Sequence, residues 1–200
     1  MTTQAVVFDL WETLATWPHE DMAPLLAAVG LTQDEWRSPE HVGRRWTGPF
    51  DGYLDWLGLD ATAARRAGEL RRRMTRQALV PVEGASATLA ELRRRGFRLG
   101  LISNCSGDVC EVWEESPFSG AFDTVVLSAD VGVCKPDERI YRIALDRLGV
   151  EAGASLFVGD GHSGELPGAT AVGMRAIQIG SYHPWDGERV SELCEVLDLV

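Results

Sequence analysis

The sequence predicts a doubly wound α/β fold: a parallel, Rossmann-like sheet with a small all-helical segment inserted after the first strand. Short apolar runs rich in β-branched residues recur along the chain, as in strands buried on both faces of a parallel sheet. Helical patterns separate most of these runs, and such strand–helix alternation is typical of doubly wound sheets. A long stretch after the first run shows helical patterns only, which predicts the insertion.

Five apolar runs are the predicted strands of the sheet. They cover residues 5–10 (AVVFDL), 97–103 (FRLGLIS), 123–130 (DTVVLSAD), 155–160 (SLFVGD) and 175–180 (RAIQIG). Helices are predicted over 84–96, which stops on a glycine, and over 136–149. The second of these begins with a proline and two acids and ends on a glycine, as a capped helix does.

The chain divides into two predicted parts. Residues 1–15 and 83–200 form the α/β core, and residues 16–82 form a helical subdomain that is too long for a connecting loop. Within it, residues 61–80 hold six arginines and one acid. We expect most of these arginines to lie on a solvated helix face.

Composition and charge exclude several classes of protein. With 45% hydrophobic and 24% charged residues, the chain has enough apolar matter for a globular core. Its formal net charge of −11 argues against a nucleic-acid partner or an anionic membrane surface. The N-terminus has no signal-peptide pattern and no apolar run is long enough to span a membrane, so we expect a cytoplasmic protein. The expected partner is a small anionic substrate that is bound locally; the oligomeric state stays open.

Polar residues with complementary chemistry follow the predicted strands. In open α/β sheets the ligand site lies outside the carboxyl ends of the strands. The polar residues at these places are the carboxylate Asp9, the hydroxyl of Ser103 with the amide of Asn104, the ammonium of Lys135, and the acidic pair Asp160 and Glu165. This set suits a nucleophile, an anion-binding pair and a site for a hard cation with oxygen ligands.

Lys135 carries a further argument. Among the 19 lysines and arginines of the chain, it is the only lysine. A compact ammonium fits where the planar fork of arginine is too bulky, between a carboxylate and a bound oxyanion.

Four short motifs in these regions resemble the signatures of the haloacid dehalogenase (HAD) superfamily. They are FDLWETL, LISN, CKP and VGDGHSGELPGA, in order and at the usual spacing. The resemblance extends from Val6 to about Gly180, and residues 16–82 occupy the place where that family inserts its helical cap. It implies a hydrolase that forms a covalent aspartyl intermediate.

The resemblance also implies roles for individual residues. Asp9 would be the nucleophile, and Ser103 and Lys135 would hold the transferred group, with Asn104 and Trp11 beside the substrate. Asp160 would bind Mg²⁺ together with Asp9, and Glu165 would support the metal where the family usually has Asp. The backbone carbonyl of Trp11 would be a further metal ligand.

Trp11 departs from the pattern of the family's phosphatases. Most of them carry a second Asp two residues after the nucleophile, which protonates the leaving group and later activates water. An indole cannot do this, and losing a general acid–base typically costs about 10²- to 10⁴-fold in rate. Glu12 and His162 are conceivable substitutes, although exposed loop positions are the simpler interpretation for both.

Two hydrolase activities therefore remain open. The haloacid dehalogenases of the family have a tyrosine at the position of Trp11, and their halide leaves without a proton. The resemblance also implies, however, that those dehalogenases work without a metal and lack the acid that Asp160 matches. We favour a Mg²⁺-dependent phosphatase acting on a small phosphorylated metabolite, because two acids in one loop are costly without a cation. The alternatives are a 2-haloacid dehalogenase-type hydrolase and a catalytically weak protein that binds a ligand or partner in the same pocket.

Two further patterns need an interpretation. GDGHSG, residues 159–164, matches the dinucleotide fingerprint, but Asp160 would direct a negative charge at the pyrophosphate, so we interpret the match as accidental. Specificity would depend on side chains of the helical segment, and the candidates are His19, His41, Arg44, Arg45 and Trp46.

Overall fold

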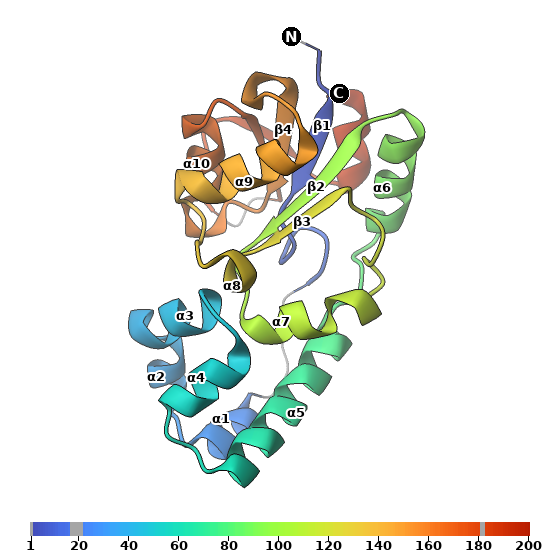
Figure 1. Cartoon of the computed structure of the whole chain (residues 1–200). Coiled ribbons are helices and arrows are strands. Elements are labelled where there is room, and N and C mark those ends of the chain that lie inside the picture. The colour runs from blue at the N-terminus through green and yellow to red at the C-terminus, as the bar shows by residue number, and fades with distance from the viewer. Residues whose placement is uncertain (1, 17–21, 181–182) are drawn as a thin grey trace.

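Six strands form one parallel sheet in the part of the chain that the structure describes, residues 2–16, 22–180 and 183–200 (Figure 1). The structure is a computed structural model of the whole chain. The strands are β1 (Ala5–Phe8), β2 (Arg98–Ser103), β3 (Thr124–Leu127), β4 (Ser155–Gly159), β5 (Arg175–Ile179) and β6 (Glu188–Val190). Their order is β3-β2-β1-β4-β5-β6, so the chain starts near the middle and winds outward on both sides. This confirms the predicted α/β fold class.

The structure differs from the predicted strands at two places. β3 ends at Leu127, and a helical turn, α8 (Ser128–Val131), replaces the end of the predicted strand 123–130. The Ser128 hydroxyl accepts a hydrogen bond from the backbone N–H of Cys105 at 3.0 Å, which ties this turn to the loop after β2. The sequence did not predict β6, because this edge strand has three residues, two of them exposed and charged, and no apolar run.

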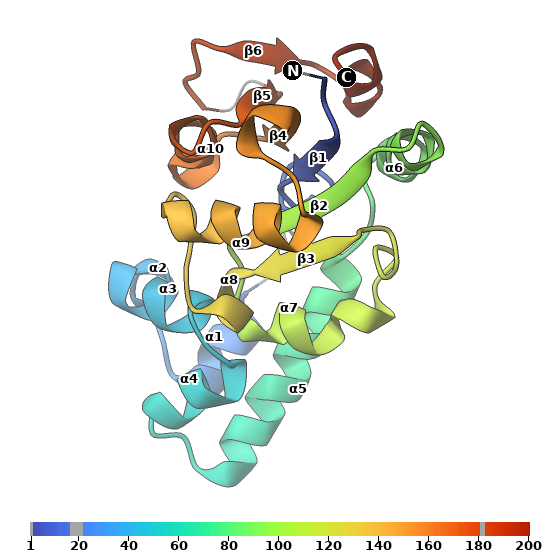
Figure 2. The same cartoon turned by 45° about the horizontal axis from the view of Figure 1, so that its top comes forward.

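Helices cover both faces of the sheet (Figure 2). The helix α6 (Ala85–Arg94) and the 3-10 helix η4 (Leu193–Asp198) lie on one face, and α9 (Glu138–Leu148) and α10 (Glu165–Ala171) lie on the other. Successive residues of β1 alternate between the two layers: Val6 and Phe8 join the first cluster, and Ala5 and Val7 join the second. A strand buried on both faces explains why the sequence shows a continuous apolar run there.

The capping signals read from the sequence set the ends of α9. The side chain of Asp137 accepts a hydrogen bond from the backbone N–H of Arg139 at 2.9 Å, which caps the first turn. Gly149 ends the helix with a φ of 64°, a left-handed conformation that glycine adopts without strain.

Five helices follow β1 and lie beyond the carboxyl ends of the strands (Figures 1 and 2). They are α1 (Ala23–Val29), α2 (Gln33–Arg37), α3 (Pro39–Trp46), α4 (Phe50–Trp56) and α5 (Ala61–Ala78). We call residues 22–78 the helical segment. Its buried side chains, among them Leu25, Phe50 and Met74, form a cluster separate from the two sheet layers.

The helix α5 contacts the core through charged side chains on α7 (Gly107–Val112) and on the 3-10 turn η1 (Trp113–Glu115). Arg71 donates to the carboxylate of Asp108 at 3.0 Å, and both side chains are buried. The Asp108 carboxylate also accepts from the hydroxyls of Thr75 and Ser106. We call these four residues the Asp108 network.

Two outer ion pairs continue this line, Arg72 with Glu111 at 2.7 Å and Arg76 with Glu115 at 2.6 Å. Arg65, Arg66 and Arg73 of the same helix are exposed, as predicted for most arginines of 61–80. Arg71 is the exception, because its guanidinium is buried against Asp108.

Gly107, the first residue of α7, lets the helical segment approach the core closely. A Cβ atom built on Gly107 would lie 2.4 Å from the backbone nitrogen of Phe50 and 2.8 Å from the carbonyl oxygen of Gly48. Only a residue without a side chain fits between these backbones.

The two remaining short helices are η2 (Ala152–Ala154) and η3 (His162–Gly164). Within the described residues, no helix has both the length and the apolar character that crossing a bilayer requires.

Candidate active site

The predicted site residues lie at the carboxyl edge of the sheet. Asp9 directly follows β1, Ser103 ends β2, and Asp160 directly follows β4. Lys135 lies in the loop between α8 and α9, and Glu165 begins α10. All five side chains are buried, although they belong to four different parts of the chain.

Lys135 sits between two carboxylates. Its ammonium donates hydrogen bonds to Oδ1 of Asp9, to Oε2 of Glu165 at 2.5 Å and to the carbonyl oxygen of Ile102 at 3.1 Å. Three acceptors satisfy the three N–H groups of an ammonium. A planar guanidinium does not match this compact arrangement, which supports the argument made from the single lysine.

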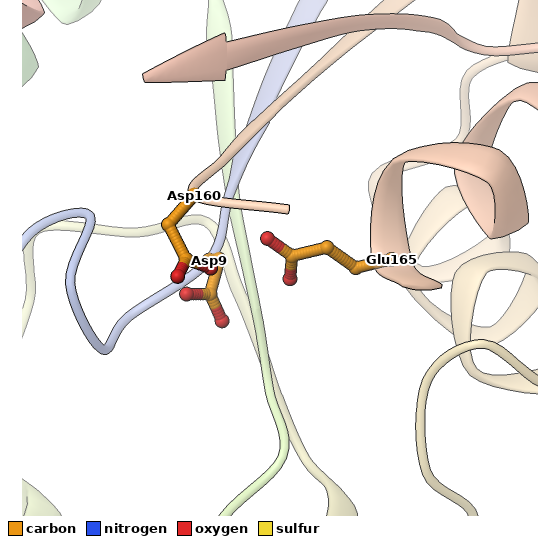
Figure 3. A group of neighbouring side chains, drawn as sticks. All are labelled: Asp9, Asp160 and Glu165. Atoms are coloured by element: carbon orange, nitrogen blue, oxygen red, sulfur yellow. The ribbon is translucent and has the colours of Figure 1, made fainter. Parts of the chain in front are cut away.

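Three carboxyl groups converge at this point (Figure 3). Asp9, Asp160 and Glu165 each offer an oxygen within 4.8 Å of the others, and all three are buried. With Lys135 as the ammonium among them, the cluster carries three negative charges and one positive charge when all are ionised. Buried carboxylates in such a group repel each other unless a cation is bound.

Burial and the neighbouring charges together shift the pKa values in this cluster. Burial raises the pKa of Asp9, and the neighbouring Asp160 adds to the rise while Lys135 opposes it. Burial also raises the pKa of Glu165, to about 8, with a contribution from Asp9. Burial acts to lower the pKa of Lys135, but the two carboxylates outweigh it, so this pKa is raised. Asp9 and Glu165 would ionise more readily with a cation in the cluster.

Asn104 holds the backbone of Lys135. Its side-chain oxygen accepts from the Lys135 N–H at 2.7 Å, and its side-chain nitrogen donates to the Lys135 carbonyl at 2.9 Å. Asn104, which was predicted to contact substrate, therefore uses its side-chain amide to hold the backbone of Lys135. Part of its surface also borders the pocket. The neighbouring hydroxyl of Ser103 is buried and has no hydrogen-bond partner among the described residues.

The loop after β4 is shaped around two carboxylates. Asp160 accepts from the backbone N–H of His162 at 2.9 Å, and Glu165 accepts from that of Gly161 at 3.0 Å. A Cβ on Gly159 would lie 2.2 Å from a carboxylate oxygen of Glu165. Glycine at 159 thus leaves the room that Glu165 occupies, which is a structural reason for one glycine of the accidental fingerprint.

A pocket of about 570 Å³ opens above these groups. Its lining residues are Asp9, Trp11, Glu12, Arg37, Trp46, Asn104, Lys135, Asp160, His162, Ser163, Glu165 and His183. Such a volume is within the range of sites for small organic ligands.

Trp11 borders the pocket two residues after Asp9, and its side chain is 9% exposed. The turn that places it includes Glu12, whose φ of 57° is unusual for a residue with a side chain. Glu12 and His162 are exposed and border the pocket as well. Their exposure agrees with the simpler interpretation that the sequence offered for both positions.

Three pocket residues were missing from the predicted site: Ser163 of the loop after β4, His183 and Arg37. His183 lies with Nε2 3.5 Å from a carboxylate oxygen of Asp160, and its ring is 5.3 Å from that of His162. It follows β5, so the rule that directed attention to the ends of the other strands would have found it. Arg37 ends the short helix α2, and no local signal in the sequence indicates that it faces the pocket.

Of the residues proposed for specificity, Trp46 lines the pocket. Three others belong to the aromatic part of the helical segment instead. His41 shares a hydrogen bond with the Tyr53 hydroxyl at 2.8 Å, Arg44 lies 4.6 Å from the ring of Trp56, and Arg45 lies 3.7 Å from the ring of Trp36. His19 lies outside the described residues.

Comparison with known proteins places the chain in a family. The sequence profile of haloacid dehalogenase-like hydrolases matches residues 3–173. The phosphoserine phosphatase of Thermus thermophilus is 35% identical over 168 residues, which cover 76% of this chain and 65% of that enzyme. The chain spans about half to two thirds of the length of this enzyme and of a second curated relative, the glyceraldehyde 3-phosphate phosphatase of Methanothermobacter thermautotrophicus.

Solved structures share the fold. A HAD phosphatase from Thermococcus onnurineus superposes with a TM-score of 0.70 at 22% identity, covering 98% of this chain and 97% of that one. A 2-haloacid dehalogenase from Pseudomonas syringae pv. Tomato DC3000 gives 0.69 at 23% identity, with 99% and 98% covered. Since the family profile spans the four motifs and most of the sheet, the chain belongs to the haloacid dehalogenase-like hydrolases.

Proposed function

We propose that this protein is a Mg²⁺-dependent phosphatase that acts on a small phosphorylated metabolite through a covalent intermediate on Asp9. The observation that carries the proposal is the buried cluster of Asp9, Asp160 and Glu165 around the ammonium of Lys135. A carboxylate that attacks a phosphate anion needs cations beside it, because two anions repel each other.

In this proposal Asp9 attacks phosphorus, the ester P–O bond breaks, and the bonding electrons leave with the alcohol oxygen, which takes up a proton. Water then attacks the aspartyl phosphate and releases inorganic phosphate and Asp9. The ammonium of Lys135 would supply positive charge beside the phosphoryl oxygens, and the buried hydroxyl of Ser103 would donate a hydrogen bond to one of them. The hydroxyl has no partner among the described residues, so it is available for that purpose.

The donor set fits Mg²⁺, which prefers oxygen ligands. Asp9 and Asp160 would hold the ion, together with the backbone carbonyl of Trp11. Glu165 already binds Lys135 and Gly161 through its two oxygens, so it would support the site mainly by orienting the lysine. When bound, the ion would supply positive charge to the phosphoryl oxygens.

The relationship to a phosphoserine phosphatase supports a phosphate ester as substrate. The helical segment would act as the cap, within the predicted boundaries 16–82. It contributes Arg37 and Trp46 to the pocket wall and would keep water from the aspartyl phosphate.

Trp11 favours a second candidate, a 2-haloacid dehalogenase-type hydrolase. Its indole occupies the place where a proton-transferring carboxylate is expected in a phosphatase, and a halide leaving group needs no proton. The purified protein should be assayed against a panel of phosphate esters and 2-haloacids, with Mg²⁺ and with EDTA. Mg²⁺-dependent phosphate release supports the proposal, metal-independent halide release supports the second candidate, and no turnover indicates a binding protein.

Mg²⁺ is expected to raise the melting temperature of the protein. At a concentration ten times its dissociation constant, a ligand that binds only the folded state stabilises it by about 1.4 kcal/mol, a rise of roughly 3–5 °C. Asp160→Ala should remove this rise, and Asp146→Ala, at an exposed position on α9, should keep it. Melts of each variant with Mg²⁺ and with EDTA test this; a wild-type protein that responds to neither contradicts the metal site.

Trp11→Asp is expected to raise turnover of alkyl phosphates by up to about 10²-fold relative to Trp11→Asn. The two variants differ in little but the ability to transfer a proton. Aryl phosphates should respond less, because their leaving groups need less protonation. Both variants lose the same indole, at roughly 3–5 kcal/mol if the cavity stays open, so their melts must be compared first. Two folded variants with equal rates on every ester would count against the phosphatase.

A further inference from the structure

We propose that the pocket selects phosphate esters that carry a carboxylate, and that Arg37 binds this second anionic group. The inference rests on the proposed phosphatase function and names its substrate class. It starts from the distribution of positive charge in the pocket wall. Among the lining residues that the structure describes, Lys135 and Arg37 are the only lysine or arginine side chains.

The two cations are in different states. Lys135 is buried and its three N–H groups already face Asp9, Glu165 and a backbone carbonyl at the point of chemistry. Arg37 is exposed to the pocket and forms no ion pair with any described carboxylate. Its Nε and Nη2 face the Gln33 side chain, whose oxygen accepts from them at 3.3 and 2.9 Å once the amide is oriented to suit both groups. Because Gln33 is a neutral acceptor, no carboxylate among the described residues compensates the charge of the guanidinium.

The local structure fixes Arg37 at a rigid corner. Helix α2 begins with a capping box, in which Thr32 and Glu35 satisfy each other's backbone N–H groups. Ser38 ends α2 and caps α3, and Pro39 starts that next helix. Two short helices with defined ends therefore hold the backbone on either side of the arginine.

The preceding residue anchors the corner. Trp36 is buried in the helical segment, where the Arg45 guanidinium lies 3.7 Å from its ring and the Tyr53 ring meets it edge-on at 6.0 Å. Adjacent helical side chains point about 100° apart. With Trp36 directed into the cluster, Arg37 is turned to the pocket, and the guanidinium is presented there with little freedom of its backbone.

The pocket is larger than a phosphoryl group requires. A sphere of 570 Å³ would be roughly 10 Å across, which leaves room for a chain of a few carbon atoms beyond the phosphate. The planar fork of arginine matches a carboxylate in a bidentate pair. An ester whose phosphate reaches Asp9 and whose carboxylate reaches Arg37 would use both ends of the pocket.

Matched pairs of substrates test this. O-phosphoserine differs from O-phosphoethanolamine by its carboxylate alone, and 3-phosphoglycerate differs from glycerol 1-phosphate by a carboxylate in place of a CH₂OH group. The wild-type protein should show a kcat/KM about 10- to 100-fold higher for the carboxylated member of each pair, mostly through KM. Both members of the first pair carry an ammonium, and neither member of the second pair does. A difference in kcat/KM between the two pairs would therefore show whether an acid such as Glu12 contributes to binding.

Arg37→Gln should remove most of this preference, and Arg37→Lys should keep part of it, since lysine retains the charge but not the fork. Arg44→Gln is the matched control, because Arg44 belongs to the same segment but stacks on Trp56 outside the pocket lining. Equal kcat/KM within each pair for the wild type, or a preference that persists in Arg37→Gln, overturns the inference.

Binding separates this inference from the proposed function. Titration calorimetry with Asp9→Asn should give a lower dissociation constant for O-phosphoserine than for O-phosphoethanolamine, and Asp9→Asn/Arg37→Gln should bring the two together. If no ester is hydrolysed but this difference is found, the phosphatase fails and the carboxylate site stands. If esters are hydrolysed and the two ligands bind alike, the carboxylate site fails alone.

Discussion

Asp9→Asn is expected to lower turnover by about 10⁴-fold or more, because it removes the proposed nucleophile. The substitution keeps the shape of the side chain, and Glu165 continues to accept from Lys135. It also removes one negative charge from a cluster of three buried carboxyl groups, so the protein should remain folded with a melting temperature close to that of the wild type.

Steady-state rates on the best ester and thermal melts measure the two effects. An acid quench with a labelled ester, followed by peptide mapping, should find label on the peptide that contains residue 9 in the wild type and none in the variant. Asp146→Asn, an exposed carboxylate on α9, is the control. An Asp9→Asn protein that keeps wild-type activity would disprove the covalent mechanism.

Asp108→Ala is expected to lower the free energy of unfolding by about 3–5 kcal/mol. The change removes the carboxylate from the Asp108 network and leaves the Arg71 guanidinium buried without its ion partner. For a protein of this size the loss corresponds to a fall in melting temperature of roughly 6–20 °C. Total stabilities of about 5–15 kcal/mol mean that such a loss is a large part of the whole.

Glu111→Ala is the matched control, one turn further along α7. Its partner Arg72 is partly exposed, so this change should cost about 1 kcal/mol or less. Replacing both members of the buried pair, as Asp108→Leu/Arg71→Met, should recover much of the loss because no charge is left unpaired. Urea unfolding of the three variants compares them. If Asp108→Ala lowers the free energy of unfolding no more than Glu111→Ala does, the Asp108 network does not stabilise the contact between α5 and α7.

The parts of the fold that local chemistry determines could be predicted from the sequence. β1, β2, β4 and β5 are short, mainly apolar runs, because each lies inside the sheet. The capped helix α9 carries its own start and stop signals. β6 could not be predicted, since a three-residue edge strand depends on its neighbour β5 rather than on any pattern of its own.

The site could be predicted where it depends on the ends of the strands, but not where it depends on the helical segment. Residues at the ends of strands meet because the topology brings strand ends together, so Asp9 and Asp160 could be expected side by side. Contacts across the helical segment follow from packing that no local pattern encodes. That is why Arg37 was missed, why Arg45 is found against Trp36 instead of the pocket, and why Arg71 is buried in an ion pair.

The solitary lysine has a consequence for spectroscopy. A protein grown with isotope-labelled lysine would carry one labelled side chain in its 200 residues, and that side chain lies among the carboxylates at the carboxyl edge of the sheet. Its ammonium resonance needs no assignment by mutagenesis. Buried and held by three acceptors, it should exchange its protons slowly with solvent. A single NMR signal would thus report the occupancy of the whole site while ligands are added.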